Sequence, residues 1–575
     1  MAEVTRAAKD GVRQVFENDR WLWEKHYPPG VSWNMPLLKK PLYHILDQAT
    51  ARYASHKLCD FQGKTFTYKK ILSLANRAAE GLQKLGVKKG VKVGLFLPNT
   101  PYSIIFYYGI LKAGGTVVNY NPLYVERELA AQIADSETDI MVTLDLKFLT
   151  DKTQKMLDET RLKKVILCKM ADILPFPKSV LYPVVKAKDI SVVPNDGKHI
   201  SYADVIDNDG NPLHVDIDAA NDIAVLQYTG GTTGIPKGAM LTHGNLYANV
   251  QQTVAWVNNI TPGEDVMIGV LPLFHVFAMA VVMNCAIQAG MKIILHPKFD
   301  LEALLRSIKR HRPTFLPAVP AIFNAIAKSP RVGSIDFSCI KFCMSGGAPL
   351  PDDVRRLFIE KTGCRIGEGY GLTESSPVAT FNPVKGLIKE GSVGMPIPGT
   401  IVEIIDRDDN ETILSLGEKG EVCIKGPQVM KGYFNKPEDT AIVLRHGRLH
   451  TGDVGYLDDE GYLFLVDRIK DIIIVRGYKV YPRFVEEAIY KHPAVEECIV
   501  AGVPDAERGE TVHAWVKPLA GQNITEDELK KFLEDKISPI EMPRRVIVRE
   551  KPLPKTAVGK LSRKDLLVQE GIIKT

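Results

Sequence analysis

The chain contains few cysteines. Eight occur in 575 residues, none of them in a C-x-x-C pair, and no histidine cluster has the spacing of metal ligands. A secreted domain held together by disulfides and a structural zinc site are therefore both disfavoured. Free thiols in a reducing cytosol are the expected state, which favours a cytoplasmic protein.

The sequence also lacks a large excess of charge of one sign. Lys and Arg number 73 against 68 Asp and Glu, giving a net charge of +5. A nucleic-acid-binding protein should show a stronger basic stripe, so no nucleic-acid partner is expected. Charged residues at 25% and hydrophobic residues at 45% are ordinary globular values, which excludes disordered and collagen-like chains.

No clear targeting or membrane-spanning segment is present. Charges interrupt residues 1–16, so a signal-peptide core is absent. Residues 266–291 contain no Asp, Glu, Lys or Arg and are long enough to span a membrane. They also contain Pro272 and His275, with glycines near both ends, so a strand, a loop and a buried helix are the expected structure.

Association with other surfaces stays open. Residues 180–185 (VLYPVV) are flanked by lysines at 178, 186 and 188 and are a candidate for peripheral membrane contact. Such contact would lie at the inner face of the membrane. The sequence also leaves open a homodimer.

The length and the pattern of apolar runs predict two unequal domains. A strand at 91–97, a helix at 102–113 and a strand at 116–118 form a β-α-β unit, and similar units recur up to about residue 385. Shorter strands separated by Gly and Asp turns follow, and predict a β-rich subdomain. We therefore expect an α/β fold, with a large multi-subdomain N-terminal domain of parallel sheets over 1–467 and a small α+β domain over 468–575.

A glycine-rich loop is the strongest local signal. A probable strand at 224–227 runs into YTGGTTGIPKG (228–238), which holds four glycines, three threonines and one lysine. Glycines let backbone N–H groups approach an anion closely, while hydroxyls and lysine add donors and charge, so the loop suits a polyphosphate. The Walker A order is absent, which disfavours a P-loop kinase or GTPase. A flexible surface loop is the structural alternative.

Three further clusters fit a nucleotide. EGYGLTE (368–374) offers a ring to stack on a purine and a carboxylate for Mg²⁺, or else a Gly-rich turn with a core tyrosine. SGGAP (345–349) closes a strand before a helix, as a ligand-binding loop does. In LHTGD (449–453) the aspartate either stabilises a tight turn or bonds to ribose hydroxyls.

Five motifs in this order resemble the adenylate-forming acyl-activating superfamily, which contains acyl- and aryl-CoA synthetases. They are YTGGTTGIPKG, EGYGLTE, HTGD (450–453), DRIKDIIIVRGYKVYP (467–482) and PKTAVGK (554–560). WEKHYPPGVSW (23–33), NYNPLY (119–124), QYTGGTTG (227–234) and KGPQVMKGY (425–433) are similar to bacterial long-chain fatty-acid–CoA ligases.

The resemblance implies a two-step reaction. ATP and a carboxylate, here a long- or medium-chain fatty acid, first form an acyl-adenylate and pyrophosphate, with Mg²⁺ as the metal. CoA then displaces AMP to form a thioester. An aryl-CoA or other carboxylate–CoA ligase is the nearest alternative, and a nucleotide-binding protein without turnover is the alternative of a different class.

The resemblance also implies roles for nucleotide-binding residues. Thr232 would contact the β- and γ-phosphates most directly, Glu374 would bind Mg²⁺, and Tyr370 would stack on adenine. Asp453 and Arg468 would hold the ribose, and Thr373 would lie near the α-phosphate. The other implied nucleotide-binding residues are Thr229, Gly230, Gly231, Thr233, Gly234, Lys237, Gly346, Gly347, Ala348, Glu368, Gly369 and Gly371.

Lys560 matches the superfamily's adenylation lysine, which bridges the substrate carboxylate and the α-phosphate. Its residue type alone predicts a solvated lysine on the surface. Lys470 matches the hinge about which the small domain swings between the two steps.

Four residues would line the acyl site and CoA tunnel. Gly477 and Lys479 follow the hinge, and Gly477 would let the pantetheine arm pass. His275 would shape the acyl site, and Met279 stands where some relatives carry a tryptophan gate. An ordinary turn glycine and a satisfied core histidine are the structural alternatives.

Overall fold

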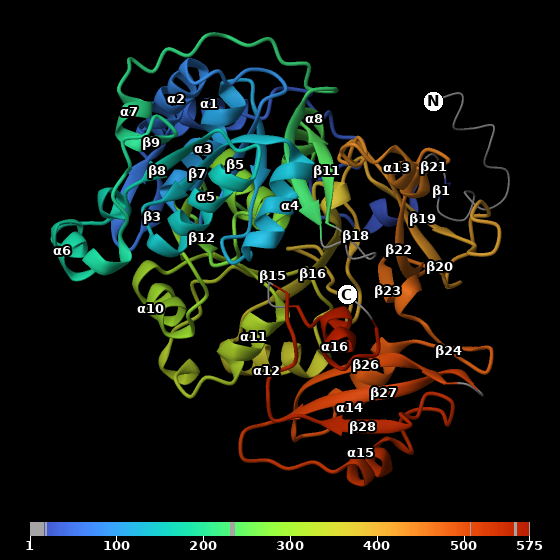
Figure 1. Ribbon diagram of the computed structural model, residues 1–575. Coiled ribbons are helices and arrows are strands. Elements are labelled where there is room, and N and C mark those ends of the chain that lie inside the picture. The colour runs from blue at the N-terminus through green and yellow to red at the C-terminus, as the bar shows by residue number, and fades with distance from the viewer. Residues whose placement is uncertain (1–15, 18–19, 230–235, 506–507, 557–559, 574–575) are drawn as a thin grey trace.

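The computed structural model describes residues 16–17, 20–229, 236–505, 508–556 and 560–573 (Figure 1). Mixed α/β layers make up the larger part, and a smaller α+β unit holds the C-terminal residues, as the sequence predicted. All eight cysteines lie in the described part and are free thiols. No helix of that part is long and apolar enough to cross a membrane.

The first sheet is parallel except for β11, which pairs antiparallel with β10. The expected unit at 91–118 is confirmed, because its two strands lie side by side with a helix between them in sequence. The strands, in spatial order, are β11 (Lys237–Thr242), β10 (Ile223–Thr229), β6 (Thr116–Asn119), β5 (Lys92–Leu95), β7 (Thr138–Leu144), β8 (Lys164–Cys168) and β9 (His199–Ser201).

The second sheet has a parallel centre and antiparallel edges. Its strands, in spatial order, are β18 (Met395–Pro396), β17 (Val378–Phe381), β16 (Ile366–Gly371), β15 (Phe342–Ser345), β14 (Phe315–Ala318), β12 (Val266–Gly269), β13 (Lys292–Leu295), β3 (Lys57–Phe61) and β4 (Lys64–Thr67). The cluster at 368–371 is therefore part of a strand, and its interpretation as a turn was wrong.

Helices fill the space between the two sheets. The helix α2 contacts β3, β4 and α3, while α3 contacts β5 and β6; α8 contacts β10, β11 and η5, while η5 contacts β12. Helices α4 and α5 cover the outer face of the first sheet, and α11 and α12 pack together beyond the second sheet (Figure 1). The bounds are α1 (His44–Tyr53), α2 (Tyr68–Lys84), α3 (Pro101–Lys112), α4 (Glu126–Ser136), α5 (Lys147–Glu159), α7 (Tyr202–Ile206), α8 (His243–Trp256), α10 (Leu301–His311), α11 (Pro320–Ala327) and α12 (Asp352–Thr362).

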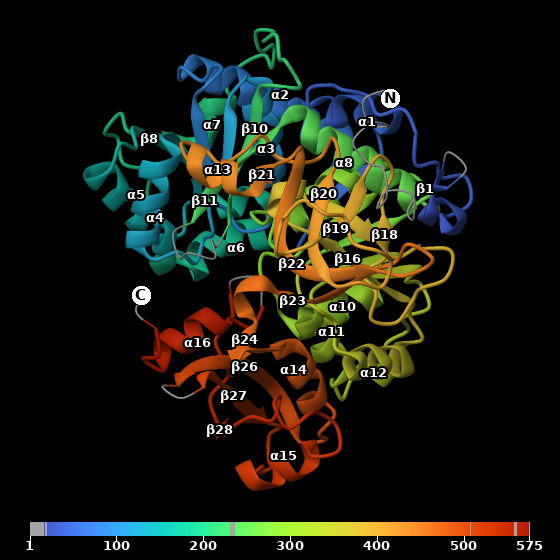
Figure 2. The same ribbon diagram turned by 90° about the vertical axis from the view of Figure 1, so that its right-hand side faces the viewer.

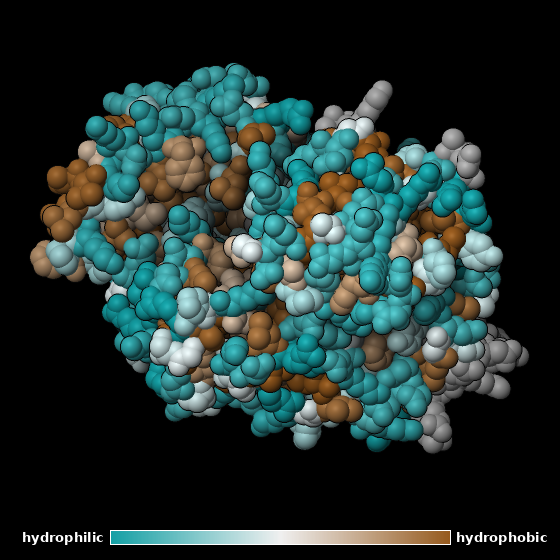
Figure 3. Space-filling model, turned by 90° about the horizontal axis from the view of Figure 1, so that it is seen from below, coloured by the Kyte–Doolittle hydropathy of each residue, from teal (hydrophilic) through white to brown (hydrophobic). Residues whose placement is uncertain are grey.

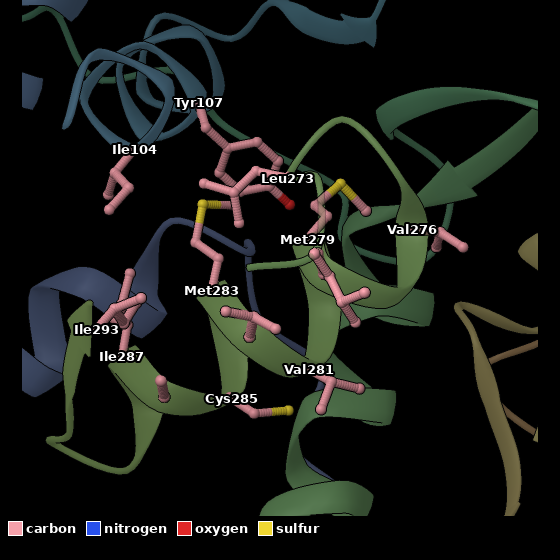
Figure 4. Packing of buried hydrophobic residues seen from close by; sticks show 14 of the residues in the cluster. Ile104, Tyr107, Leu273, Val276, Met279, Val281, Met283, Cys285, Ile287 and Ile293 are labelled. Atoms are coloured by element: carbon pink, nitrogen blue, oxygen red, sulfur yellow. The ribbon is translucent and has the colours of Figure 1, made fainter. Parts of the chain in front are cut away.

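The uncharged segment 266–291 is buried within these layers. It forms β12, a loop, the π-helix η5 (Ala278–Cys285) and α9 (Ala286–Gln288), which confirms the expected strand, loop and buried helix. Figure 4 shows Leu273 and Met283 beside Tyr107 of α3, with Val281 and Cys285 lower on the π-helix. Packing against α3 and α8 accounts for the absence of charge.

An antiparallel sheet forms the predicted β-rich part. Its strands are β19 (Ile401–Ile405), β20 (Gly420–Lys425), β22 (Arg448–Leu457), β21 (Leu444–Arg445) and β23 (Leu463–Arg468). Of the two interpretations of residues 449–453, the one that placed the aspartate in a tight turn was wrong. These residues lie inside β22, where a register shift against β20 and the positive φ of Gly452 (72°) bend the strand.

The C-terminal residues form a separate sheet with its own hydrophobic core, below the larger part in Figures 1 and 2. The elements are η8 (Ile469–Asp471), β24 (Ile473–Val475), β25 (Tyr478–Val480), α14 (Pro482–Tyr490), β26 (Val495–Asp505), β27 (Gly509–Pro518), α15 (Glu526–Leu533), β28 (Arg545–Val548) and α16 (Arg563–Gln569).

Candidate active site

A cleft of about 3230 Å³ opens where the parallel strands of both sheets end at their carboxyl ends. Loops there are free to present side chains to a ligand, which is the usual place for a site in such sheets. The β-rich part and the C-terminal unit complete the walls. Figure 3 shows the surface hollowed in this region, with apolar atoms inside the hollow.

The two strands that the glycine-rich segment connects in sequence, β10 and β11, meet the wall of the cleft at Thr229 and Lys237. Thr229 and Lys237 are partners across that antiparallel pair, and both line the cleft. The Lys237 ammonium is ion-paired with Asp439 of α13 (Pro437–Val443) and lies 5.4 Å from the ring centre of Tyr433. The loop residues Gly230, Gly231, Thr232, Thr233 and Gly234 lie outside the described residues.

Tyr370, Asp453 and Arg468 form one hydrogen-bonded group in the cleft. The Tyr370 hydroxyl donates to Asp453 Oδ2 at 2.7 Å, and Arg468 Nε lies 3.1 Å from Asp453 Oδ1. Asp453 and Arg468 are brought together by the register of β22 with β23. The Asp453 carboxylate raises the pKa of Arg468, and burial raises that of Tyr370.

Glu374 lies beside Thr373 in the short helix η7 (Thr373–Ser375) at the cleft wall. The Tyr433 hydroxyl donates to Glu374 Oε1 at 2.6 Å, and the backbone N–H of Met430 donates to the Glu374 carbonyl at 2.8 Å. The segment KGPQVMKGY thus fixes this carboxylate. Tyr433 was not identified from the sequence as a site residue, although it is the last residue of that segment.

Gly346, Gly347 and Ala348 line the cleft just after β15. A Cβ on Gly347 would lie 3.3 Å from Lys560 Cε, and one on Gly346 would lie 3.2 Å from the Phe277 ring. The absence of side chains here keeps the space beside Lys560 open, so that a ligand can approach the backbone.

Packing within β16 accounts for two other glycines. A Cβ on Gly371 would lie 1.9 Å from the Pro377 carbonyl oxygen, and one on Gly369 would lie 2.8 Å from Phe381. Glu368 accepts a hydrogen bond from the Leu350 N–H at 3.0 Å, and burial raises its pKa to about 7. All three residues line the cleft.

Lys560 enters the cleft from the C-terminal unit and is half-buried, so it is not a solvated surface lysine. Burial and the neighbouring Arg468 lower its pKa to about 8, against the opposing effect of Asp453. His275 lines the same cleft, so the core-histidine interpretation does not hold. Burial, with a smaller contribution from Lys560, lowers the pKa of His275 to about 3.

A half-buried ion-pair cluster attaches the tail to the hinge region. Arg563 donates to both carboxylate oxygens of Glu486 at 2.7 Å and to Asp471 at 3.0 Å, and it lies 3.7 Å from Asp467. Arg563 begins α16, three residues after Lys560, and was not identified from the sequence. Lys470 lies between the two aspartates, lines the cleft, and has its pKa lowered by burial.

Three of the residues assigned to the acyl and CoA tunnel lie away from the cleft lining. Gly477, with φ +84°, and Lys479 are exposed around the turn between β24 and β25. Met279 is buried in the π-helix, where its sulfur lies 3.3 Å from the Asn119 amide nitrogen. In this conformation Gly477 is a turn glycine, because its backbone requires a positive φ.

Glu421 positions the strand segment that carries Asp453. It accepts a hydrogen bond from the Gly452 N–H at 3.0 Å, and its other oxygen lies 2.8 Å from His450 Nδ1. Both contacts precede Asp453 directly, so Glu421 sets the direction of that side chain. The sequence carried no signal for it, since β20 reads as an ordinary strand.

Two family models match the chain. The AMP-binding enzyme model matches residues 46–434, and the AMP-binding enzyme C-terminal domain model matches residues 485–560. A long-chain-fatty-acid–CoA ligase of Bacillus subtilis is 43% identical over 551 residues, covering 95% of this chain and 98% of its own. 4-Coumarate–CoA ligase 1 of Petroselinum crispum is 34% identical over 88% of this chain and 89% of its own.

A solved structure matches the whole architecture. The o-succinylbenzoate coenzyme A synthetase of Bacillus subtilis, in complex with ATP and a magnesium ion, superposes with a TM-score of 0.73. It is 25% identical and covers 92% of this chain and 99% of its own.

Proposed function

The chain belongs to the AMP-binding enzyme family, and on that premise we propose that it is a fatty-acid–CoA ligase. It activates a long- or medium-chain fatty acid with ATP and transfers the acyl group to CoA. The observation that carries this proposal is the convergence of Lys560, the Tyr370–Asp453–Arg468 group and Glu374 on one cleft that is also lined by apolar side chains.

The chemistry requires no nucleophile from the enzyme. In the first step a carboxylate oxygen of the acid attacks the α-phosphorus of ATP, and the bond to pyrophosphate breaks. In the second step the CoA sulfur attacks the acyl carbon, AMP leaves, and the thiol proton is released. Catalysis then rests on positioning the substrates and neutralising their charge.

The cleft residues divide these tasks. Lys560 would place its ammonium between the substrate carboxylate and the α-phosphate, where two anionic groups must approach each other. Tyr370 would stack on adenine. Asp453 would accept hydrogen bonds from the ribose hydroxyls, and its position is fixed by Arg468 and Glu421.

The residues at η7 fit a magnesium ion. Glu374 and Thr373 offer a carboxylate and a hydroxyl, the oxygen donors that this ion prefers, and Tyr433 holds the carboxylate in place. Magnesium, when bound, supplies neutralisation of phosphate charge. Thr229 and Lys237 would hold the phosphates together with the loop between them.

An alkyl chain is supported by the apolar side chains that line one part of the cleft. Val276, Phe277, Val281 and Met344 line it. A second cavity of about 10 Å³, lined by apolar side chains except for Thr253, shares Thr253, Val281 and Met344 with the cleft. Because this cavity is small, a longer chain would require the flexible methionine side chains to move.

We also propose that the chain divides at 467/468 and rotates about Lys470 between the two steps. The separate C-terminal core supports this division. Lys560 lies in the cleft while Gly477 lies outside it, which supports the assignment of the conformation described to the adenylation step. Rotation would bring Gly477 and Lys479 to the acyl-adenylate.

The free thiols support a cytoplasmic location, since an oxidising compartment would favour their pairing. The exposed helix α6 (Lys178–Val185) supports contact with the inner face of the membrane. The homodimer that the sequence left open stays a prediction.

A substrate panel tests the proposed function. Acyl-CoA formation should require ATP, Mg²⁺ and CoA, and should be faster with C8 to C18 fatty acids than with 4-coumarate or benzoate. An aryl acid is the specific alternative, because the similar 4-coumarate–CoA ligase 1 of Petroselinum crispum is named for an aryl substrate. Preference for an aryl acid would establish that alternative, and no thioester from any acid would contradict ligase activity.

A further inference from the structure

The helix α6 (Lys178–Val185) presents an apolar face to solvent. Val180 and Val184 are 63% and 76% exposed, and Leu181 and Val185 are 54% and 73% exposed. Residues four apart lie on the same side of a helix, so these two pairs form one stripe. A surface helix normally turns such a stripe toward the core, so the orientation here is inverted.

Phe176, which is 83% exposed, extends the stripe at its N-terminal side. These five side chains are called the apolar patch below. Figure 3 shows hydrophobic atoms gathered at the left edge of the molecule, on the side where Figure 1 places α6. Contiguous exposed patches of this kind mark interaction sites on soluble proteins.

The outward orientation is fixed by contacts on the other side of the helix. Tyr182 is half-buried and lines the cleft, as does Lys186 at the helix end. Beyond the helix, the Ser191 N–H donates to the Asp145 carbonyl at 2.8 Å, which ties the following segment to the first sheet. The patch therefore cannot turn inward without breaking these contacts.

The charges around the patch are mainly positive. Residues 169–192 contain four lysines and two aspartates, with no arginine or glutamate, for a net charge of +2. Lys178, Lys186 and Lys188 are exposed, and only Lys186 pairs with Asp189, at 3.0 Å, among the ion pairs of the described residues. This charge complements an anionic surface, whereas a second copy of the chain would bring a rim of the same sign.

We propose that the apolar patch and its flanking lysines dock on an anionic bilayer. The patch would enter the boundary between headgroups and acyl chains, and the lysines would contact the headgroups. Because Tyr182 and Lys186 also line the cleft, docking places the cleft beside the bilayer, from which a fatty acid can enter. Entry of a fatty acid from the bilayer rests on the proposed function, whereas bilayer binding itself does not.

Vesicle co-sedimentation without ATP, fatty acid or CoA tests the surface. The wild type should bind vesicles of phosphatidylcholine with phosphatidylglycerol, and binding should weaken with salt. The variant Val180→Ser/Val184→Ser/Val185→Ser should bind at least about tenfold more weakly, because it loses the inserted side chains. The matched control Leu213→Ser/Leu387→Ser changes residues that are 77% and 58% exposed elsewhere, and should bind as the wild type does.

A second variant, Lys178→Glu/Lys188→Glu, separates charge from apolar insertion. It should lose binding to anionic vesicles while its thermal unfolding stays unchanged. Absence of wild-type binding, or equal binding by the triple-serine variant, would overturn the proposal. Dissolution of an oligomer by that variant, without any vesicle binding, would instead make the patch a contact between copies and also refute it.

Octanoyl-CoA formation in vesicle-free buffer separates the two proposals. The triple-serine variant should keep this activity, because its substitutions face away from the cleft. If the wild type bound vesicles but formed no acyl-CoA, the proposed function would fail while the docking surface stood.

Discussion

The hydroxyl of Tyr370 lies 2.7 Å from Oδ2 of Asp453, which couples the residue proposed for adenine to the residue proposed for ribose. Tyr370→Phe keeps the ring and removes this hydrogen bond. A hydrogen bond to a charged group contributes about 1.5–3 kcal/mol, so we expect KM for ATP to rise by roughly 10- to 100-fold. Steady-state kinetics at saturating acid and CoA measure this.

Asp453→Asn is the companion variant for that prediction. It replaces the carboxylate that both Tyr370 and Arg468 contact, and should impair ATP use more than Tyr370→Phe does. An unchanged KM for ATP in both variants would show that this group does not hold the nucleotide.

The pKa of Lys560, lowered to about 8, predicts a pH limit on adenylation. A lysine is charged below its pKa, so the active form is present below about pH 8 and is lost above it. We expect kcat/KM for fatty-acid-dependent pyrophosphate release to fall about tenfold per pH unit above that value, since this parameter reports the free enzyme. Lys560→Arg should be slower but free of this fall, because arginine stays charged. A wild-type profile flat to pH 10 would contradict the assignment.

Gly477→Leu should retain acyl-adenylate formation and lose thioester formation. A Cβ at Gly477 meets nothing within 4 Å, so the variant is not crowded in the conformation described. Its positive φ of 84° costs a leucine about 1–3 kcal/mol of strain. Gly521→Leu is the matched control, with φ +79° and the same open surroundings in the C-terminal unit.

The two half-reactions are measured separately for this pair of variants. The control should support both steps, because it carries the strain without lying on the proposed CoA path. Normal acyl-CoA yield from Gly477→Leu would remove the glycine from that path. Equal loss in both variants would attribute the effect to strain alone.

Val281→Trp should shorten the range of accepted acids. Val281 lines both the cleft and the small cavity, so a larger side chain here would block the path of an alkyl tail from one to the other. We expect kcat/KM for palmitate to fall at least about tenfold relative to octanoate, since overpacking costs about 1–3 kcal/mol. Val281→Ala should shift the preference toward longer acids. Equal losses for both acids would place the alkyl tail elsewhere.

The β-α-β order was predictable from the sequence, because buried parallel strands and helices alternate with clear breaks. The expected helix at 102–113 corresponds to α3 (Pro101–Lys112) to within one residue at each end. The turn alternative for 449–453 could not be excluded from the sequence, since a glycine and an aspartate inside a bent strand look like turn residues. Gly477 has the positive φ of a turn glycine in the conformation described, and its place on the CoA path stays a prediction.

No sequence pattern indicated the residues that hold other site residues in position. Glu421 and Arg563 stand in ordinary strand and helix sequence, and only the folded chain brings them to Gly452 and Glu486. Tyr433 was within a quoted motif, yet its contact with Glu374 spans 59 positions of sequence and could not be read from spacing. Side-chain partners of this kind depend on sheet register, which sequence patterns leave open.

The central claim is that the cleft forms an acyl-adenylate with Lys560 as the bridging cation. Exchange of labelled pyrophosphate into ATP, measured with palmitate and Mg²⁺ but without CoA, tests it most directly. The account predicts palmitate-dependent exchange in the wild type and its loss in Lys560→Ala, which should still convert supplied palmitoyl-adenylate and CoA to the thioester. Exchange that does not depend on palmitate would contradict the central claim. Equal impairment of both half-reactions in the Lys560→Ala variant would also contradict it.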